Sequence, residues 1–356
     1  AILHKDLATW GYRALSFLVV SCPCALVVSV PLSFFGGIGG ASRKGILIKG
    51  SNYLEILSNV QTIVFDKTGT LTKGNFRVKS IEAVGDKDEL LKIAAHVESF
   101  SNHPIAKSIQ ESYVEEINKE IITEHKEISG HGVTAKINGK TVYLGNSKLM
   151  AKLGINVKEE TSSATVVYIA IDNQYAGKIE IADELKEDSK LAIENLKKQG
   201  VKQTVMLTGD RKDVGEDVAK QLGMDKVFTE LLPTDKVDKL QEILDNKNGK
   251  VAFVGDGLND APALAMADVG IAMGAYGTDA AIEAADVVIM TDEPSKICDA
   301  IKTARKTIKI SKENIGFAIT VKLITLLLVF LGIATMWQAV FADVGVTVIA
   351  TLNALR

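Results

Sequence analysis

Residues 63–72 read IVFDKTGTLT, a short apolar run that ends in a carboxylate and a polar turn containing glycine. Helical patterns such as 184–198 and 234–244 follow, and they alternate with further short apolar runs. These runs lie at 203–207, 251–254, 269–272 and 287–290. Short buried strands that alternate with helices predict a parallel, doubly wound α/β sheet. Because ligands bind at the carboxyl ends of such strands, we expect Asp66 and the turns at 208–210 and 255–257 to converge on one site.

The middle of the chain interrupts this alternation. Two helical patterns are followed there by alternating β-segments, whose turns carry Asn138-Gly139 and Asp172-Asn173. Asn-Gly between two β-segments is a strong hairpin signal. We therefore predict an α+β domain at 75–181, inserted into a first domain that is formed by 43–74 and 182–300.

Hydrophobic residues are concentrated at the two ends of the chain. No charged residue occurs within 14–42, and the stretch 314–355 holds only Lys322 and Asp343. About 20 apolar residues suffice to cross a bilayer. We therefore predict transmembrane helices at both ends: one segment in 1–42, and two helices in 301–356 that are joined near 336–338.

The overall composition excludes several other classes of protein. Of the 356 residues, 47% are apolar and 24% are charged, which is typical of a folded chain and not of a disordered one. The net charge of −3 provides no basic field, so we expect no nucleic-acid partner. Three cysteines are too few for a disulfide framework.

Two of the cysteines form Cys22-Pro23-Cys24 inside the first apolar segment. Proline removes a helical hydrogen bond, so the two thiols are expected to face a locally unwound turn. Thiolates bind soft or borderline metal ions. Lys322 and Asp343 are candidates for the same site, because ionisable groups inside a membrane are costly. A carboxylate at Asp343 suits a divalent ion, and Lys322 can pair with it when no ion is bound. A monovalent copper site, the alternative, would not need the carboxylate.

Asp66 stands directly after its strand, where a carboxylate can attack a phosphoryl group and form an aspartyl phosphate. Phosphoryl transfer requires charge neutralisation more than acid–base help, so a cation and Mg²⁺ are expected nearby. Lys236 offers the cation, and Asp256 offers a second carboxylate for the magnesium ion.

Three motifs, DKTGTLT at 66–72, TGD at 208–210 and GDGLNDAPAL at 255–264, resemble in their order those of the P-type ATPases. The phosphorylation domain of that family belongs to the haloacid dehalogenase superfamily. The resemblance implies that Asp66 is phosphorylated and that Asp66, the Thr68 carbonyl and Asp256 bind Mg²⁺. The catalytic set that it implies is Asp66, Lys67, Thr68, Thr208, Gly209, Asp210, Lys236, Asn259 and Asp260.

One position separates a pump from a phosphatase. Soluble phosphatases of the superfamily carry a second aspartate two residues after the nucleophile, as a general acid–base, whereas this chain has Thr68. Without that base the aspartyl phosphate is expected to persist, as an energy-storing intermediate requires. A phosphatase would not need the membrane spans, and a signalling protein with an aspartyl phosphate would not need Cys22 and Cys24.

Ser101-Asn102-His103-Pro104, with Glu98 just before it, and Gly130-His131-Gly132 resemble the signature of the heavy-metal subgroup. The resemblance implies that the inserted domain binds ATP. His103 would stack on the adenine or hydrogen-bond to it, and Glu98 would accept a hydrogen bond from its amino group. Gly130 and Gly132 would allow close approach of the backbone.

Within that subgroup, Cys-Pro-Cys, Lys322 and Asp343-x-Gly345 resemble the zinc, cadmium and lead exporters. The resemblance implies ATP-driven export across a cell membrane, with the ATP-binding domains in the cytoplasm. It also implies an actuator domain with a Thr-Gly-Glu loop and earlier transmembrane helices. Thr-Gly-Glu does not occur in this sequence, so we expect the chain to be the carboxy-terminal half of a longer pump. Where many relatives have Asp-x-x-Arg, this chain has Asp183 and Lys186.

Overall fold

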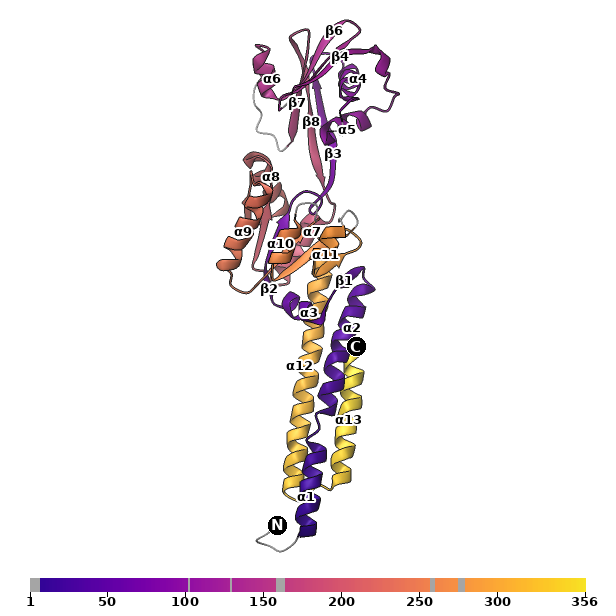
Figure 1. The fold of residues 1–356 in the computed structure, drawn as a ribbon, viewed down its shortest axis with the longest axis vertical. Helices are drawn as coiled ribbons and strands as arrows, with labels where there is room; N and C mark the ends of the chain where they lie inside the picture. Colours follow the sequence, from indigo (N-terminus) through magenta and orange to yellow (C-terminus); the bar gives the residue numbers. More distant parts are fainter. Residues whose placement is uncertain (1–6, 102, 129, 158–163, 257–259, 275–278) are drawn as a thin grey trace.

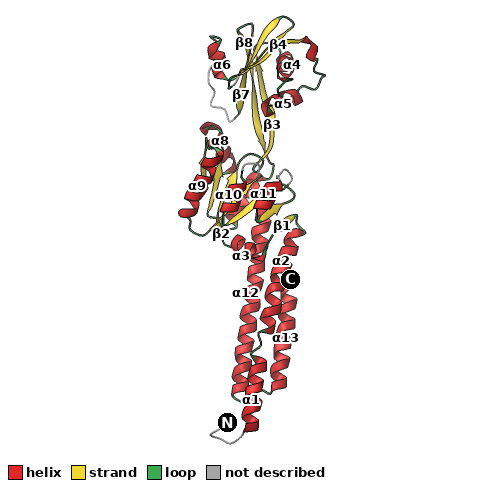
Figure 2. Cartoon of the chain, viewed as in Figure 1, coloured by secondary structure: helices red, strands yellow, loops and turns green. Residues whose placement is uncertain are grey.

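The computed structural model describes residues 7–101, 103–128, 130–157, 164–256, 260–274 and 279–356. The molecule is elongated (Figure 1). A helical bundle forms one end, a sheet covered by helices lies in the middle, and a second sheet forms the other end (Figure 2). Each of these three parts corresponds to a different hydrophobic pattern in the sequence.

The middle sheet has seven strands in the order β1-β13-β12-β11-β2-β9-β10. All neighbours are parallel except β1 and β13, which are antiparallel. The strands are β1 (Ile46–Ile48), β2 (Val60–Asp66), β9 (Gln203–Leu207), β10 (Lys226–Phe228), β11 (Lys250–Gly255), β12 (Val269–Met273) and β13 (Val287–Ile289). The predicted parallel α/β sheet is therefore confirmed, with β2 near its centre.

Helices cover both faces of this sheet, because side chains alternate along each buried strand. Ile63 and Phe65 pack into one core, and Val64 between them packs into the other. The helices are α3 (Ser51–Ser58), α7 (Ser189–Lys198), α8 (Lys212–Leu222), α9 (Pro233–Asp245), α10 (Ala261–Met266) and α11 (Asp279–Ala284). The prediction of a helix over 184–198 is wrong at its start, since the chain stays extended as far as Leu185.

The second sheet is antiparallel, with the strand order β3-β8-β7-β6-β5-β4. Its strands are β3 (Thr72–Ala83), β4 (Ile122–Ile128), β5 (Gly132–Ile137), β6 (Lys140–Gly145), β7 (Thr165–Ile171) and β8 (Gln174–Leu185). Its helices are α4 (Lys87–Glu98), α5 (Pro104–Ser112), the 3-10 turn η1 (Lys119–Ile121) and α6 (Ser147–Lys152).

Both predicted hairpins are present in this sheet. Asn138 and Gly139 have φ values of 49° and 82°, and Asp172 and Asn173 have φ values of 48° and 63°. Two consecutive residues with positive φ are what a two-residue hairpin turn of type I′ requires. The turns therefore set the register of β5 on β6 and of β7 on β8.

The antiparallel pair β3 and β8 carries the chain out of the middle part and back again. The expected domain limits at 74/75 and 181/182 fall inside these two strands, and they stay a prediction.

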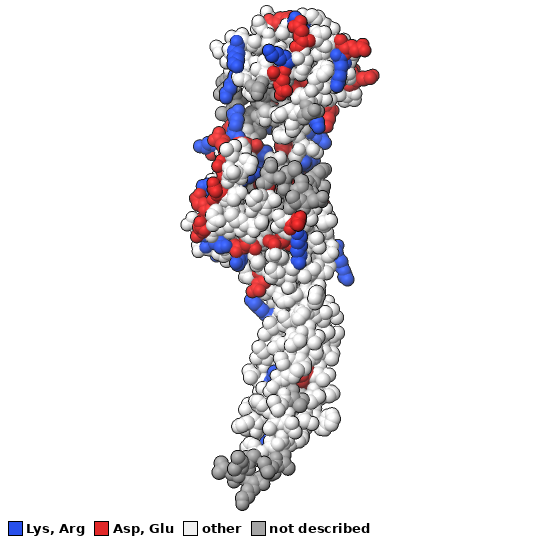
Figure 3. Space-filling model, in the orientation of Figure 1, with Lys and Arg blue, Asp and Glu red and all other residues white. Residues whose placement is uncertain are grey.

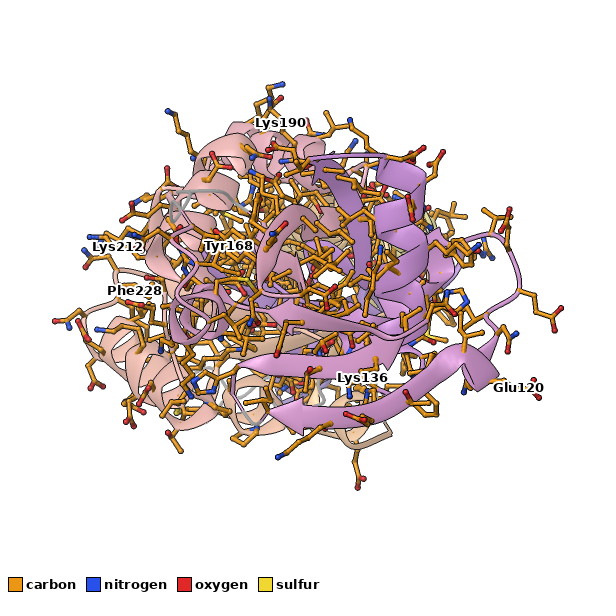
Figure 4. The ribbon with its side chains drawn as sticks, turned by 90° about the horizontal axis from the view of Figure 1, so that it is seen from above. Glu120, Lys136, Tyr168, Lys190, Lys212 and Phe228 are labelled. Atoms are coloured by element: carbon orange, nitrogen blue, oxygen red, sulfur yellow. The ribbon has the colours of Figure 1, made fainter. Side chains whose placement is uncertain are left out.

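Viewed from above, Lys212 and Phe228 of the middle part lie at one edge of the molecule (Figure 4). Lys136 and Glu120 of the second sheet's part lie toward the other edge.

The bundle consists of α1 (Leu7–Val20), α2 (Cys24–Ser42), α12 (Ser295–Phe330) and α13 (Met336–Ala354). Of the described helices, α2, α12 and α13 are long and apolar enough to cross a membrane. Charged side chains crowd the visible face of the two sheet-containing parts and are scarce on the bundle (Figure 3). Large apolar side chains such as Phe330 and Phe341 are 72% and 82% exposed, as expected for a surface that faces lipid.

The connection between the last two helices lies earlier than predicted. Met336–Gln338 is the first turn of α13 and not the expected link. The link spans residues 331–335, where Gly332 has a φ of +72° and Thr335 forms a capping box with Gln338. An S/T-x-x-Q box marks a helix start, so this signal was present in the sequence.

Candidate functional site

Asp66 ends the central strand β2 and is only 4% exposed. Its Oδ1 accepts a hydrogen bond from Nζ of Lys236, which also lies 3.5 Å from Oδ1 of Asp260. Burial and the neighbouring Asp260 raise the pKa of Asp66 to about 7, although Lys236 lowers it. The structure therefore brings three predicted catalytic residues together, in a group with more negative than positive charge.

Asp256 joins this group from the end of β11. A Cβ on Gly69 would lie 2.1 Å from Oδ2 of Asp256, so the carboxylate packs against the loop that follows Asp66. Gly69 has a φ of +72°, a conformation that favours glycine. The loop and Asp256 can therefore touch only because this residue has no side chain.

The donor set fits Mg²⁺. Asp66 and Asp256 supply oxygen ligands of the kind that Mg²⁺ prefers, and Asp260 shares one ammonium group with Asp66. Burial also raises the pKa of Asp260, which a bound cation would reverse. Among the described residues, no three His, Cys, Asp or Glu side chains already form a cluster that would hold a metal ion. The expected magnesium set contains only two carboxylates. The third ligand in that set is a backbone carbonyl, that of Thr68, whose side chain is exposed.

The TGD turn lies at the end of β9, the strand beside β2. Thr208 is buried, and its Oγ1 accepts a hydrogen bond from the amide of Asp210 at 3.1 Å. Gly209 is exposed at the tip of the turn. This hydrogen bond stabilises the turn beside the strand that carries Asp66.

Lys67 points to a second group of carboxylates. Its Nζ lies 2.7 Å from Asp210 and 3.8 Å from Asp183, and its side chain is 6% exposed. Burial raises the pKa of Asp183. Lys67 thus links the TGD turn to β8. Asn259, the remaining predicted catalytic residue, lies outside the described residues.

The predicted nucleotide residues lie around the second sheet. Glu98 ends α4 and is 6% exposed, and burial, together with Glu127, raises its pKa to about 7. His103 is exposed, and its Nδ1 accepts a hydrogen bond from the amide of Ile105 at 3.3 Å. His103 is therefore the N-cap of α5, and its Nε2 faces away from that bond.

The two glycines of the GHG motif differ in their surroundings. Gly130 has a φ of +70°, and no atom lies within 4 Å of where a Cβ would stand, so its side is open to an approaching ligand. A Cβ on Gly132 would lie 2.0 Å from the carbonyl oxygen of Leu144, so this glycine serves the packing of β5 on β6. Asn146, which the sequence analysis missed, donates to the Gly130 carbonyl at 2.9 Å and caps α6. An asparagine between a strand and a helix was the available signal.

The bundle brings the four predicted ion-site residues together. Helix α1 ends at Val20 and α2 begins at Cys24, so the backbone is unwound at Pro23. Nζ of Lys322 on α12 donates to the carbonyl of Cys22, which this break leaves free, and lies 3.9 Å from Oδ1 of Asp343. The side chain of Cys24 interacts with those of Cys22 and Asp343. Three helices therefore contribute to one polar group within the apolar bundle, in which the Cys22, Cys24 and Asp343 side chains do not yet form a cluster that would hold a metal ion.

Comparison with known proteins agrees with this geometry. A profile of the haloacid dehalogenase-like hydrolases matches residues 60–268. The catalytic domain of the CPx-ATPase CopB-B is 33% identical, and the match covers 74% of this chain and 98% of that domain, with a TM-score of 0.60. The chain belongs to the heavy-metal P-type ATPases. Such ATPases are membrane proteins, and the three candidate spans identify this chain as an integral membrane protein.

Other P-type ATPases match across the membrane part as well. The crystal structure of a zinc-transporting PIB-type ATPase in its E2.Pi state has a TM-score of 0.87 and 37% identity, and the match covers 98% of this chain and 58% of that chain. The cadmium, zinc and cobalt-transporting ATPase of Bacillus subtilis is 55% identical over 98% of this chain. The zinc-transporting ATPase of Synechocystis is 52% identical over 99%. The chain spans about half the length of these curated relatives, 50% and 49% respectively.

Proposed function

We propose that this chain is part of a pump that exports divalent zinc, cadmium or lead ions at the expense of ATP. The ATP-binding part, residues 75–181, would lie in the cytoplasm with the phosphorylation domain. The convergence of Cys22, Cys24, Lys322 and Asp343 on one break in the bundle carries this proposal. The names of the relatives, which transport zinc, cadmium or cobalt, support it.

The proposed chemistry begins at Asp66. A carboxylate oxygen of Asp66 attacks the γ-phosphorus of ATP, the bond from that phosphorus to the bridging oxygen breaks, and ADP leaves with the electron pair. Lys236 lies beside the attacking carboxylate and neutralises charge on the transferred group. Thr208 and Gly209 would contact the same phosphoryl group. Mg²⁺, held by Asp66, the Thr68 carbonyl and Asp256, would offset the remaining negative charge when bound.

The aspartyl phosphate would persist because position 68 holds no general base. Its hydrolysis then depends on a residue from elsewhere in the whole pump, for which the actuator domain is the expected source. ATP itself would bind at Glu98, His103 and Gly130, with Asn146 holding the Gly130 turn in place. Gly132 would contribute to the same site through its close packing on β6 and not through an open side.

Charge favours a divalent ion over monovalent copper. Two thiolates and the Asp343 carboxylate would provide soft ligands and a further negative charge for one ion in a medium of low dielectric constant. Lys322, 3.9 Å from Asp343, supplies a replacement cation when the metal ion leaves. A copper(I) site with two thiolates would have no use for either group.

Binding and transport by the full-length pump test this assignment. Asp343→Asn should lose most Zn²⁺ and Cd²⁺ binding and the ATPase activity that these ions stimulate, because the amide leaves the ion's charge uncompensated. Asp299→Asn, which changes a carboxylate near the start of α12 whose side chain is 40% exposed, is the matched control. If Asp343→Asn binds and pumps like the parent, the divalent assignment is wrong and a two-cysteine copper site is the better interpretation. Lead is tested in the same panel of metals.

A further inference from the structure

An open groove lies where the bundle meets the middle part, between α3 and the portion of α12 that precedes its apolar span (Figure 1). Its volume is about 520 Å³. The walls include the end of α3 and one side of α12, with Ser58, Asn59, Arg305, Lys309, Lys312 and Glu313. We call this feature the basic groove. It is separate from the candidate sites for the phosphoryl group, the nucleotide and the transported ion.

The basic groove carries more positive than negative charge. Arg305 donates to two backbone carbonyls, one at the end of α3 and one just past α7, and these neutral partners leave its charge uncompensated. Lys309 lies 4.0 Å from Glu313 but is 74% exposed, so this ion pair is weak. Glu313 is also shared with Arg356, at 3.3 Å. Lys312 is exposed and forms no ion pair with any described residue. The groove therefore attracts an anion.

The basic groove lies at the edge of the apolar span. Residues 314–321 of α12 follow it directly and carry no charge, and Lys322 is the single charge from there to the end of the helix at Phe330. Lysine and arginine gathered beside a span mark the cytoplasmic side of a membrane. The headgroups of anionic phospholipids lie at this depth in the cytoplasmic leaflet, and they attract such residues.

The same side of α12 continues into the membrane as an apolar stripe. At about 100° per residue, the three cations of the basic groove and residues 319, 323 and 327 lie on one side of the helix. Ile319, Leu323 and Leu327 are 43%, 63% and 57% exposed, so this stripe is open to acyl chains. A soluble phosphate would make no use of the stripe. The groove and the stripe together therefore match the two parts of one phospholipid molecule.

We propose that the basic groove binds the headgroup of an anionic phospholipid of the cytoplasmic leaflet, whose acyl chains lie along the stripe at 319–327. Lys309 and Lys312 contact the phosphodiester, and Arg305 adds a charge that its backbone partners hold in place. The Asn59 side chain accepts a hydrogen bond from a headgroup hydroxyl. Binding at this site requires neither ATP nor the metal ion, so the inference stands apart from the proposed function.

Native mass spectrometry of the full-length pump in detergent tests the site, with dioleoyl phosphatidylglycerol and dioleoyl phosphatidylcholine as the probes. We expect one phosphatidylglycerol molecule to bind about tenfold or more tightly than phosphatidylcholine. Lys309→Gln combined with Lys312→Gln should weaken that binding about 25-fold, about fivefold for each charge removed beside a membrane. Both side chains are exposed, so the double variant should fold. Lys309→Arg combined with Lys312→Arg keeps both charges and should stay within about twofold of the parent.

Lys302→Gln combined with Lys306→Gln is the matched control. Both lysines are exposed on the same portion of α12 but lie outside the basic groove. The control removes the same amount of charge, and it should change the affinity by less than about threefold. An equal loss in the control and in the groove variant would overturn the proposal, because the attraction would then belong to the whole basic surface.

Two further outcomes would also overturn the proposal. In one, the full-length pump retains phosphatidylglycerol no better than phosphatidylcholine, as it would if another segment of the pump filled the groove. In the other, glycerophosphoglycerol, which is the same headgroup without acyl chains, displaces phosphatidylglycerol at an equal concentration. The groove would then be a site for a soluble anion and not for a lipid.

Discussion

Replacing Asp66, the proposed nucleophile, should stabilise the protein when Mg²⁺ is absent. Asp66 is 4% exposed, and burial and Asp260 raise its pKa from 3.8 to about 7. A carboxyl group whose pKa is raised in the folded state binds its proton more tightly there than in the unfolded chain. Its contribution to stability is therefore fully present below pH 3.8 and is lost as the pH rises toward 7. Asp66→Asn has no titratable group at this position, so its stability does not fall for this reason as the pH rises.

The size of the effect follows from the difference in pKa. A shift from 3.8 to about 7 is about 3 units, and at about 1.4 kcal/mol per unit this corresponds to about 4 kcal/mol. The free energy of unfolding of Asp66→Asn, relative to that of the parent, should therefore rise by up to about 4 kcal/mol as the pH increases from about 4 to about 8. At about 2 °C per kcal/mol or more, the melting temperatures should separate by about 8 °C.

The assay is thermal unfolding of parent and variant in detergent, with EDTA, at pH values from about 5 to about 8.5. Asp66 interacts with Lys236 and Asp260, so the difference between the two proteins reports the titration of this group of charges and cancels that of distant residues. Adding Mg²⁺ should narrow the gap, because the ion favours the ionised carboxylate of the parent. A difference in melting temperature that stays constant with pH would refute the reasoning. A parent whose melting temperature rises relative to that of the variant as the pH increases would also refute it.

Two further predictions concern the loop after Asp66 and the nucleotide site. Gly69→Ala places a Cβ 2.1 Å from Oδ2 of Asp256 at a φ of +72°, so the Mg²⁺ concentration that gives half-maximal phosphorylation should rise about tenfold or more. Gly85→Ala, at a position with nothing within 4 Å of a Cβ, is the control, and an unchanged Mg²⁺ dependence in Gly69→Ala would contradict the placement of Asp256. Because burial raises the pKa of Glu98 to about 7, ATP affinity should increase as the pH rises from about 6 to about 8 and this carboxylate ionises, whereas Glu98→Gln should show no such increase. Calorimetric titration of ATP measures both, and parallel pH profiles would remove Glu98 from the site.

Much of the candidate site could be predicted because its residues follow directly on strands. Asp66, Thr208 and Asp256 each stand at the carboxyl end of a short apolar run, and parallel pairing of those runs places them at one edge of the sheet. The prediction of Asp260 as a site residue came from the family resemblance alone. The fold places its carboxylate near the Lys236 ammonium group, beside Asp66. The link between the last two helices lies away from its predicted place, since an apolar stretch gives its length but only weak signals of where it turns.

The sequence by itself determined the class of the middle sheet, the two hairpins and the presence of apolar helices at both ends, since each depends on local periodicity or turn chemistry. Only the tertiary structure decided which charges meet. Lys67 pairs with Asp210 and Asp183, and Lys186 pairs with Asp292, each pair joining residues that are far apart in the chain. An ion pair depends on the position of two side chains in space, and no pattern of neighbouring residues encodes that distance. The hydrogen bond from Lys186 to the Gly69 carbonyl and that from the amide of Ser295, at the start of α12, to Asp188 exist for the same reason only after the chain has folded.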